Sequence, residues 1–421
     1  MKSQLKNKIV CPEPGRRVFV AMSGGVDSSV AAALLKKQGY EVIGAHMRCY
    51  NVDGCAEQDA EDARRAAEIL GIPFYTFDFE QEYKDKVVNY MVDGYRKGIT
   101  PNPDVMCNKE IKFGLFLKKA LEMGADYVAT GHYVRLAKMR HIKRQPTRFF
   151  VGNIPQAQFA RSPKYFGEIV PREKKIRPLE ADYSGSHRNS GLAIYRLLIA
   201  KDTNKDQSYF LWTLTQKQLK HCLFPIGDYK KPQVRKLAQK FGLLNANKKD
   251  SQGICFLGKV SLADFLKQYI PEKRGAVLNT AGKKIGEHSG AHFYTIGQRR
   301  LGIKKLRLGA GSNTKPHYVS DKNIKTNVIT IAGGENNPEL YKKTVVLTDI
   351  NLIESVGNLP IAVRARVRYR QPLAVAVLNK LKTNYQLVFK VPQKFIAQGQ
   401  SAVFYDKKGV MLGGGIIKSV L

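Results

Sequence analysis

The chain has 421 residues, which is enough for two to three domains of ordinary size. Hydrophobic residues make up 43% of it and aromatic residues 10%, as in soluble globular proteins, and no apolar run approaches the ~18 residues of a membrane span. Its 70 Lys and Arg outnumber 35 Asp and Glu, and this net charge of +35 favours nucleic acid before anionic membrane as a partner. The alternative is a lysine-rich proteome, in which many proteins carry excess charge without a specific partner.

The first third of the chain alternates strand-like and helix-like segments. Short apolar runs predict strands at residues 18–22, 41–47, 74–79 and 126–130. Helical periodicity, with glycine or proline at several ends, predicts helices at residues 28–38, 57–70, 81–97 and 109–123. This alternation predicts a parallel sheet that is covered by helices.

The sequence after the first third of the chain changes in composition and periodicity twice. Residues 138–190 are basic and show neither period, which indicates an insertion that either contacts RNA or is a lineage-specific addition. Helical patterns return at residues 211–221, 232–241 and 262–269. From about residue 275, short β-rich runs indicate a small antiparallel barrel or sandwich, at residues 328–332, 345–349, 361–369, 373–378, 386–391 and 401–405. We therefore expect domains at residues 1–220, 221–285 and 286–421.

A glycine-rich turn, Ser23-Gly24-Gly25-Val26-Asp27-Ser28, follows the first predicted strand. Its two glycines allow the backbone to approach an anion closely, and its serine hydroxyls can donate to phosphate oxygens. The helix that begins near Ser28 directs its free N–H groups to the same place. Asp27 cannot bind phosphate directly, so we assign it to magnesium or to loop order. The turn lacks the lysine of the G-x-x-x-x-G-K-[ST] loop and resembles the PP-loop of ATP pyrophosphatases, which transfer AMP to a carbonyl oxygen.

Two further motifs place cysteines in expected loops. Residues 100–108 carry Asn102, Asp104 and Cys107, and their two prolines are expected to keep the whole stretch stiff and non-helical. Residues 250–256 place Cys255 in a glycine-bearing turn. A thiolate is a strong nucleophile once its pKa falls, so the two cysteines can serve one site. Taken singly, each is more simply an inert thiol, as we expect for Cys11, Cys49, Cys55 and Cys222.

Motifs in order over about residues 18–410 closely resemble the family of tRNA-specific 2-thiouridylases. They are the S-G-G-V-D-S turn and the segments 102–113, 131–133, 205–211, 253–256, 297–299, 368–371 and 399–403. Residues 138–190 depart from the family, whose connection is usually shorter here. The fold expected for the chain is a Rossmann-like parallel sheet with helices on both faces, a small and mostly helical central domain, and a C-terminal antiparallel β-barrel.

The resemblance implies replacement of the 2-oxygen of the wobble uridine, position 34 of tRNA, by sulfur. ATP with Mg²⁺ would adenylate that oxygen, which is otherwise a very poor leaving group. Cys255 would carry a persulfide from a separate sulfur donor and attack carbon 2. Cys107 would release the sulfur and close a Cys107–Cys255 disulfide, with Asp104 as general base.

The resemblance also implies two sets of binding residues. The ATP contacts of the family correspond to Ala21, Met22, Ser23, Gly24, Gly25, Val26, Asp27, Ser28, Met47 and Gly131. Its contacts with the target base and tRNA correspond to Asn102, Pro103, Asp104, His132, Lys205, Asp206, Gln207, Arg368, Tyr369 and Gln400. The excess of positive charge then has tRNA as its partner. With neither a secretory signal nor a membrane span in the sequence, we expect a cytoplasmic protein without a membrane partner.

Other interpretations remain at this point. A PP-loop amide synthetase would leave both cysteine motifs and the charge unexplained, and a non-catalytic RNA-binding protein would leave the ATP loop idle. An iron–sulfur cluster held by Cys107, Cys255 and Asp104 is a further alternative. Four arginines alternate along residues 361–369 and just beyond, which predicts one cationic strand face formed by Arg364, Arg366, Arg368 and Arg370.

Overall fold

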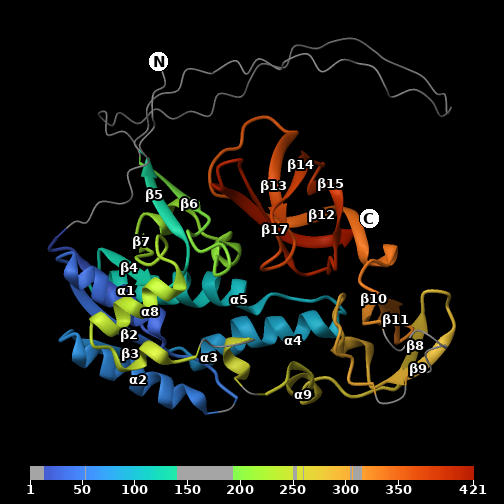
Figure 1. Ribbon diagram of the computed structural model, residues 1–421, viewed down its shortest axis with the longest axis horizontal. Coiled ribbons are helices and arrows are strands. Elements are labelled where there is room, and N and C mark those ends of the chain that lie inside the picture. The colour runs from blue at the N-terminus through green and yellow to red at the C-terminus, as the bar shows by residue number, and fades with distance from the viewer. Residues whose placement is uncertain are drawn as a thin grey trace, which may run out of the picture. The chain divides into compact units, whose positions relative to one another are not determined.

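The computed structural model describes residues 14–52, 54–139, 193–249, 254–258, 260–303, 306 and 315–421. The chain divides into two units, Met1–Met139 with Tyr195–Leu421, and Arg140–Ile194. The basic insertion expected at residues 138–190 lies almost wholly outside the described residues. Figure 1 shows the chain and labels its helices and strands.

A five-stranded parallel sheet forms the N-terminal part of the first unit (Figure 1). Its strands run in the order β3-β2-β1-β4-β7 and comprise β1 Arg17–Ala21, β2 Glu41–Arg48, β3 Phe74–Asp78, β4 Tyr127–Thr130 and β7 Cys222–Leu223. The order reverses between β1 and β4, because the chain first builds outward on one side of β1 and then crosses to the other. Ligands of open parallel sheets bind at such a switch point, beyond the carboxyl ends of the strands.

Helices cover both faces of the sheet, as predicted. The helical segments up to β7 are α1 Val26–Lys37, α2 Cys55–Ile69, α3 Glu80–Tyr83, α4 Asn89–Arg96, α5 Pro103–Met106, α6 Leu117–Glu122 and α7 Gln216–Leu219. Two π-helical segments, η1 Lys84–Val88 and η2 Cys107–Phe116, and the 3-10 turn η3 Ser208–Leu211 complete this set. Those after β7 are α8 Lys231–Lys240 and α9 Leu262–Lys267, with the 3-10 turns η4 Leu244–Asn247, η5 Cys255–Leu257, η6 Ala291–Phe293 and η7 Pro338–Leu340.

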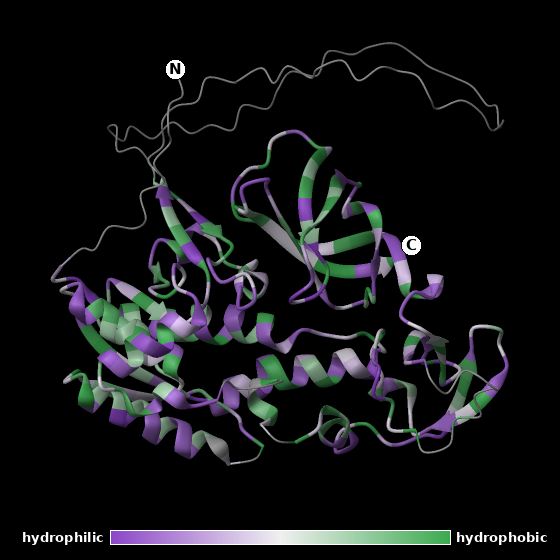
Figure 2. Ribbon diagram, in the orientation of Figure 1, coloured by the Kyte–Doolittle hydropathy of each residue, from purple (hydrophilic) through white to green (hydrophobic). Residues whose placement is uncertain are grey.

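The alternation of side chains along β1 explains the two faces. Val18 and Val20 are fully buried in a cluster with residues of α1, α2 and α8, whereas Phe19 and Ala21 lie in a second cluster with residues of α4 and η2. Successive strand residues point to opposite faces, so a continuous apolar run fits a strand that is buried on both sides. The polar and apolar residues of α2 give it the banded colours of Figure 2, as expected for a helix with one buried face.

Beyond the parallel sheet lie a mixed sheet and a closed barrel. The mixed sheet has the order β10-β11-β8-β9 and comprises β8 Gly275–Asn279, β9 Lys284–His288, β10 His317–Asn323 and β11 Val328–Gly333. The antiparallel barrel comprises β12 Tyr341–Leu352, β13 Ile361–Arg366, β14 Ala374–Lys380, β15 Tyr385–Lys394, β16 Ser401–Tyr405 and β17 Met411–Val420. A two-stranded sheet of β5 Arg135–Met139 and β6 Ile194–Leu198 flanks the insertion. The β-rich runs from residue 345 onward therefore form a barrel rather than a sandwich, whereas the run expected at residues 328–332 belongs to β11 of the separate mixed sheet.

The barrel has an apolar interior of its own. Val345, Leu347, Val363, Leu378 and Phe389 are at most 4% exposed and belong to one cluster. Alternate positions on these strands are more exposed, which is the pattern of a small barrel filled by its own side chains. Among the described helices, none combines the length and the apolarity needed to cross a membrane.

Candidate active site

The glycine-rich turn leaves β1 at the switch point and enters α1. Gly24 has φ +70°, and a Cβ there would lie 2.3 Å from the carbonyl oxygen of Asp59, so only glycine fits this position. The Ser28 hydroxyl accepts from the Ser23 backbone N–H (3.2 Å) and donates to the Gly25 carbonyl (3.1 Å). No side chain caps the N-terminus of α1 at Gly25. Its first N–H groups and the positive end of the helix dipole can therefore receive an anion.

Asp27 is held by two partners that are distant in sequence. Its carboxylate oxygens accept from Lys231 Nζ at 2.9 and 2.8 Å, and one of them also accepts from the Tyr133 hydroxyl at 2.7 Å. Of the two roles expected for Asp27, these contacts favour loop order, because direct ligation of a metal would compete with Lys231. Within the described residues, no group of three or more His, Cys, Asp and Glu is arranged to hold a metal ion.

The end of β4 lies against the glycine-rich turn. A Cβ at Gly131 would come within 2.6 Å of the Ser28 backbone nitrogen, so the close approach of the end of β4 to the start of α1 requires glycine. The next residue, His132, is 7% exposed, and its ring lies 6.1 Å from that of Phe113 in η2. Burial lowers the pKa of His132 well below its usual value, so its imidazole is neutral at pH 7. The end of β4 thus connects the anion-binding turn to η2.

One expectation about residues 100–108 is wrong. A helix begins at Pro103 rather than after residue 108, and Asn102 caps it by accepting from the Val105 backbone N–H at 3.2 Å. Proline is suited to the first helical position, because its missing N–H would have no partner there and its φ is already helical. Asp104 and Cys107 therefore lie three residues apart on the first turns of a helix, close to one another, instead of in a loop.

The helix that begins at Pro103 becomes a π-helix at Cys107. This segment, η2, runs for 10 residues, and such wide turns are rare and often found at functional sites. Burial raises the pKa of the half-buried Asp104, and the nearby Lys112 cation partly opposes that shift. Lys112 also lowers the pKa of His132 further. One lysine of η2 therefore acts electrostatically on both groups.

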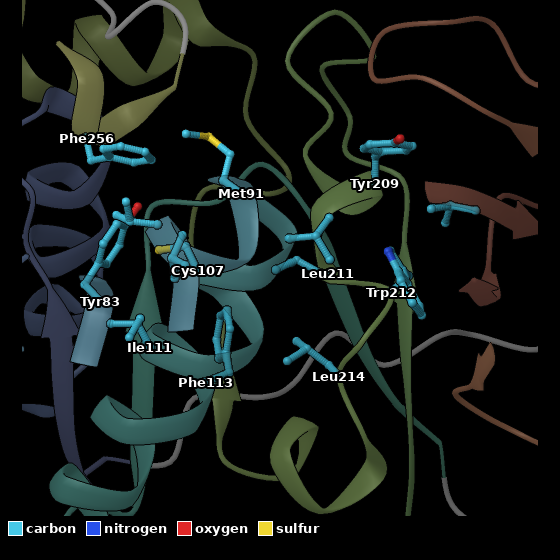
Figure 3. Packing of buried hydrophobic residues seen from close by; sticks show 14 of the residues in the cluster. Tyr83, Met91, Cys107, Ile111, Phe113, Tyr209, Leu211, Trp212, Leu214 and Phe256 are labelled. Atoms are coloured by element: carbon cyan, nitrogen blue, oxygen red, sulfur yellow. The ribbon is translucent and has the colours of Figure 1, made fainter. Parts of the chain in front are cut away.

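Cys107 lies in an apolar cluster. It is 9% exposed and lies in the cluster that contains Tyr83, Ile111 and Phe256 (Figure 3). Phe256 directly follows Cys255, its ring centroid lies 5.7 Å from that of Tyr83, and its carbonyl accepts from the Val52 backbone N–H at 3.2 Å. The side chain of Cys255 and residues 250–253 lie outside the described part of the chain. The segments of both cysteines are thus anchored in one core.

Three residues expected to bind tRNA contact other segments of the chain. Asp206 is 2% exposed and accepts from Arg366 at 2.9 Å. The Gln207 side chain accepts from the Tyr133 backbone N–H at 2.9 Å. Gln400 Nε2 donates to the carbonyls of residues 100 and 101, both at 3.1 Å. These contacts fix the positions of the end of β4, the start of the Asn102-capped helix and the barrel relative to one another.

The arginines near the end of β13 do not share one strand face, so that prediction is wrong. The strand ends at Arg366, which is buried against Asp206, whereas Arg364 is exposed. Burial lowers the pKa of Arg368, and Arg370 has φ +66°, so the chain has left the extended conformation by that point. A period of two in the sequence does not show where a strand ends.

The remaining expected residues lie in three places. The ring of Tyr369 packs against that of Phe210 at an interplanar angle of 49°, with centroids 4.5 Å apart, and the Arg370 guanidinium lies 5.3 Å from the Tyr369 ring. Ala21 and Met22 are buried at the end of β1, and Met47 is half-buried near the end of β2. Lys205 is half-buried in the segment before η3.

Sequence reasoning missed several residues around the turn, namely Tyr133, Lys231, Asn245 and Lys248, together with Lys112 beside Asp104. Tyr133 directly follows the Gly131-His132 pair, so its position in the sequence indicated that it lies near the site. Lys231 and the two residues in and beyond η4 did not, because they reach the turn only through the folding of more than 200 intervening residues.

Comparison with known proteins places this geometry in a family. A family model described as tRNA methyl transferase HUP domain matches residues 16–152 and 183–259. The model of its PRC-barrel domain matches residues 263–333, and one described as aminomethyltransferase beta-barrel domain matches residues 342–417. Among solved structures, a 4-thiouridine synthetase bound to RNA and ATP covers 61% of this chain and 50% of its own, with 13% identity and a TM-score of 0.30.

Two curated relatives match over nearly their full lengths. The tRNA-specific 2-thiouridylase MnmA 1 of Geobacillus kaustophilus is 40% identical over 96% of this chain and 96% of its own. The tRNA-specific 2-thiouridylase MnmA of Pseudomonas paraeruginosa is 40% identical over 97% of this chain and 96% of its own. At that identity and coverage, the chain belongs to the MnmA family of tRNA-specific 2-thiouridylases.

Proposed function

We propose that this chain uses ATP to replace the 2-oxygen of the wobble uridine, position 34 of tRNA, with sulfur. The observation that carries the proposal is the junction at the end of β4. There Gly131 lies against the glycine-rich turn, and the adjacent His132 packs against the helix of Asp104 and Cys107. An activated oxygen and a nucleophilic thiol can therefore act on one base between these two elements.

Adenylation is the first step of the proposed reaction. The residues from Ala21 to Ser28, with Gly131 and Met47, hold ATP, whose phosphates accept from the N–H groups at the start of α1. Mg²⁺ entering with ATP would neutralise phosphate charge and would be held by phosphate and water, and the Asp27 oxygens would stay bonded to Lys231. The O2 of uridine attacks the α-phosphate and pyrophosphate leaves, while Asp104 accepts the N3 proton of the same base.

Sulfur transfer follows in two balanced displacements. The terminal sulfur of a Cys255 persulfide, loaded by a separate persulfide donor, attacks carbon 2, and AMP leaves with the former 2-oxygen. The Cys107 thiolate then attacks the inner sulfur of Cys255, and the outer sulfur leaves with the electron pair as the thiocarbonyl of 2-thiouridine. A Cys107–Cys255 disulfide remains, and an external thiol must reduce it before the next cycle.

Binding of tRNA completes the proposal. Asn102, Pro103 and His132 border the target base, and Lys205, Arg368, Tyr369 and Gln400 surround the anticodon loop, with Asp206 and Gln207 holding that surface in place. The base must leave its stack to reach the site, and aromatic faces such as that of Tyr369 suit an unstacked nucleotide. The net charge of +35 supports a polyanionic substrate, and a cytoplasmic location follows from that substrate.

Nucleoside analysis tests this function directly. The protein is incubated with ATP, a persulfide donor of demonstrated activity and unmodified tRNA, and the digested nucleosides are analysed by mass spectrometry. We expect 2-thiouridine that depends on ATP and on the donor, together with release of pyrophosphate that depends on tRNA. If pyrophosphate were released at the same rate with and without tRNA, and no 2-thiouridine formed, the result would contradict thiolation. It would instead favour a PP-loop amide synthetase that acts on a small carboxylate.

The acidic side of the pH profile tests the role of Asp104. Because burial raises its pKa above the ~3.9 of an exposed aspartate, Asp104 loses its proton only at higher pH. A general base must be deprotonated, so the rate of tRNA-dependent pyrophosphate release should fall as the pH is lowered through this raised pKa. We expect Asp104→Asn to reduce that rate by about 10²–10⁴-fold and to remove this acidic limb. An Asp104→Asn enzyme with the rate and profile of the wild type would exclude the role.

A further inference from the structure

The carbonyl of Gly24, in the glycine-rich turn, receives hydrogen bonds from the other end of the domain. Asn245 Nδ2 in η4 donates to it at 3.0 Å, and Lys248 Nζ lies at 3.5 Å from the same oxygen. Asn245 is 8% exposed and also donates to the Ser29 hydroxyl at 2.9 Å. Two residues of the segment that continues to Cys255 therefore contact the phosphate-binding turn directly.

The chemistry of the partners fixes the direction of the Asn245 amide. A backbone carbonyl only accepts, so the atom that faces Gly24 must be the NH₂ group and not the oxygen. The Ser29 hydroxyl already donates to the Gly25 carbonyl at 3.1 Å, which leaves it to accept from Asn245. A residue without a donor at position 245 would leave the buried Gly24 carbonyl with the weaker Lys248 contact alone.

Lys248 is held in place by two carboxylates of α2. Its ammonium lies 2.7 Å from Asp59 and 2.5 Å from Asp62. Burial opposes its charge, but the hydrogen bonds to both carboxylates outweigh burial and raise its pKa, so Lys248 is a cation at physiological pH. A fixed cation beside the Gly24 carbonyl also strengthens the dipole of the peptide between Gly24 and Gly25.

The planar peptide transmits this contact to the other side of the turn. In a trans peptide the C=O and the next N–H point in opposite directions, so the Gly25 N–H faces away from Asn245 and Lys248. In the proposed ATP site that N–H is one of the donors at the start of α1. A hydrogen bond at one end of a peptide polarises the other end, so a phosphate on the Gly25 N–H and the donors on the Gly24 carbonyl strengthen one another.

We propose that Asn245 and Lys248 are positioning residues that couple ATP binding to the segment leading to Cys255. The inference rests on the proposed ATP site. Coupling between two sites is reciprocal, so loss of the donors should weaken ATP binding, and ATP should stabilise residues 244–249. ATP bound at the turn thereby also restrains residues 244–249, the described part of the chain that precedes Cys255.

The test compares Lys248→Met with Lys249→Met, since Lys249 is the adjacent, exposed lysine. ATP affinity is measured by calorimetry and the KM for ATP by pyrophosphate release. We expect Lys248→Met to raise the dissociation constant and the KM for ATP about tenfold, with kcat at saturating ATP nearly unchanged. Lys249→Met should match the wild type, and Lys248→Arg should recover part of the loss. Asn245→Ala should also weaken ATP binding, and it serves if Lys248→Met does not fold.

Amide hydrogen exchange supplies the reciprocal measurement. ATP should slow exchange at residues 244–249 in the wild type and in Lys249→Met, but far less in Lys248→Met. Equal ATP affinity in the two methionine variants, or exchange that ATP does not slow in the wild type, would overturn the coupling alone. A wild-type protein that does not bind ATP would overturn the proposed function as well, so the two failures are distinguishable.

Discussion

Replacing Cys107 by alanine is expected to reduce 2-thiouridine to background while ATP binding stays within about twofold of the wild type. The reason is chemical, because in the proposed mechanism the Cys107 thiolate performs the second displacement, and in a single turnover without added thiol no other nucleophile replaces it. The variant should stall with tRNA joined to Cys255 through a disulfide that thiols reduce. Nucleoside mass spectrometry measures the first effect, and non-reducing electrophoresis of the protein–tRNA adduct measures the second.

Cys222 provides a matched control for that variant. Like Cys107 it is a buried cysteine; it lies in β7, and its thiol donates to the Gln218 carbonyl at 3.1 Å. Burial raises the pKa of Cys222, so it is protonated and unreactive at neutral pH. Cys222→Ala removes the same atoms from the core as Cys107→Ala, and we expect it to retain thiolation. If Cys107→Ala also retained thiolation, Cys107 would not be the second nucleophile.

The parallel sheet and its glycine-rich turn were predictable because their signals are local. A buried strand such as β1 is a continuous apolar run in the sequence. The positive φ of residue 24 and its close approach to Asp59 require glycine at that position, and the glycine is visible in the sequence. The barrel strands were recognisable for the same reason, since polar and apolar residues alternate within single runs. Closure into a barrel was not local, because it depends on β12 pairing with both β15 and β17.

Two features of the candidate site could not be predicted from the local sequence. Prolines at residues 101 and 103 were expected to exclude a helix, but a proline at the first helical position starts one, and the cap at Asn102 decides between these outcomes. The bonds of Asp27 to Lys231 and of Gly24 to Asn245 join residues 204 and 221 positions apart. Only the fold that brings α8 and η4 against the turn creates these contacts.

The ion pair between Arg366 and Asp206 carries the largest expected effect on stability. Both side chains are nearly inaccessible, at 7% and 2% exposed, and their atoms lie 2.9 Å apart. Asp206 also accepts from the Ala200 backbone N–H at 3.0 Å and from the Ser208 hydroxyl at 2.9 Å. The pair links the end of β13 to the segment before η3, so its loss loosens the barrel from the chain that carries Gln207.

Arg366→Ala should lower the free energy of unfolding by about 3–5 kcal/mol, because it leaves the buried Asp206 carboxylate without its cation. Arg364→Ala, two residues earlier on the same strand but exposed, should change it by less than about 0.5 kcal/mol. Urea denaturation can be followed through the single tryptophan, Trp212, whose indole N–H donates to the Ser401 hydroxyl at 3.0 Å.

A double variant separates the charge from the packing. Combining Asp206→Asn with Arg366→Met removes both charges and keeps similar volume, so it should destabilise the protein less than Arg366→Ala alone. If the double variant were as unstable as Arg366→Ala, packing of the arginine side chain against Tyr405, whose ring centroid lies 5.3 Å from the guanidinium, would be the dominant contribution. Thiolation by the double variant then shows whether tRNA binding needs the two charges themselves or only the link that they form between β13 and the segment before η3.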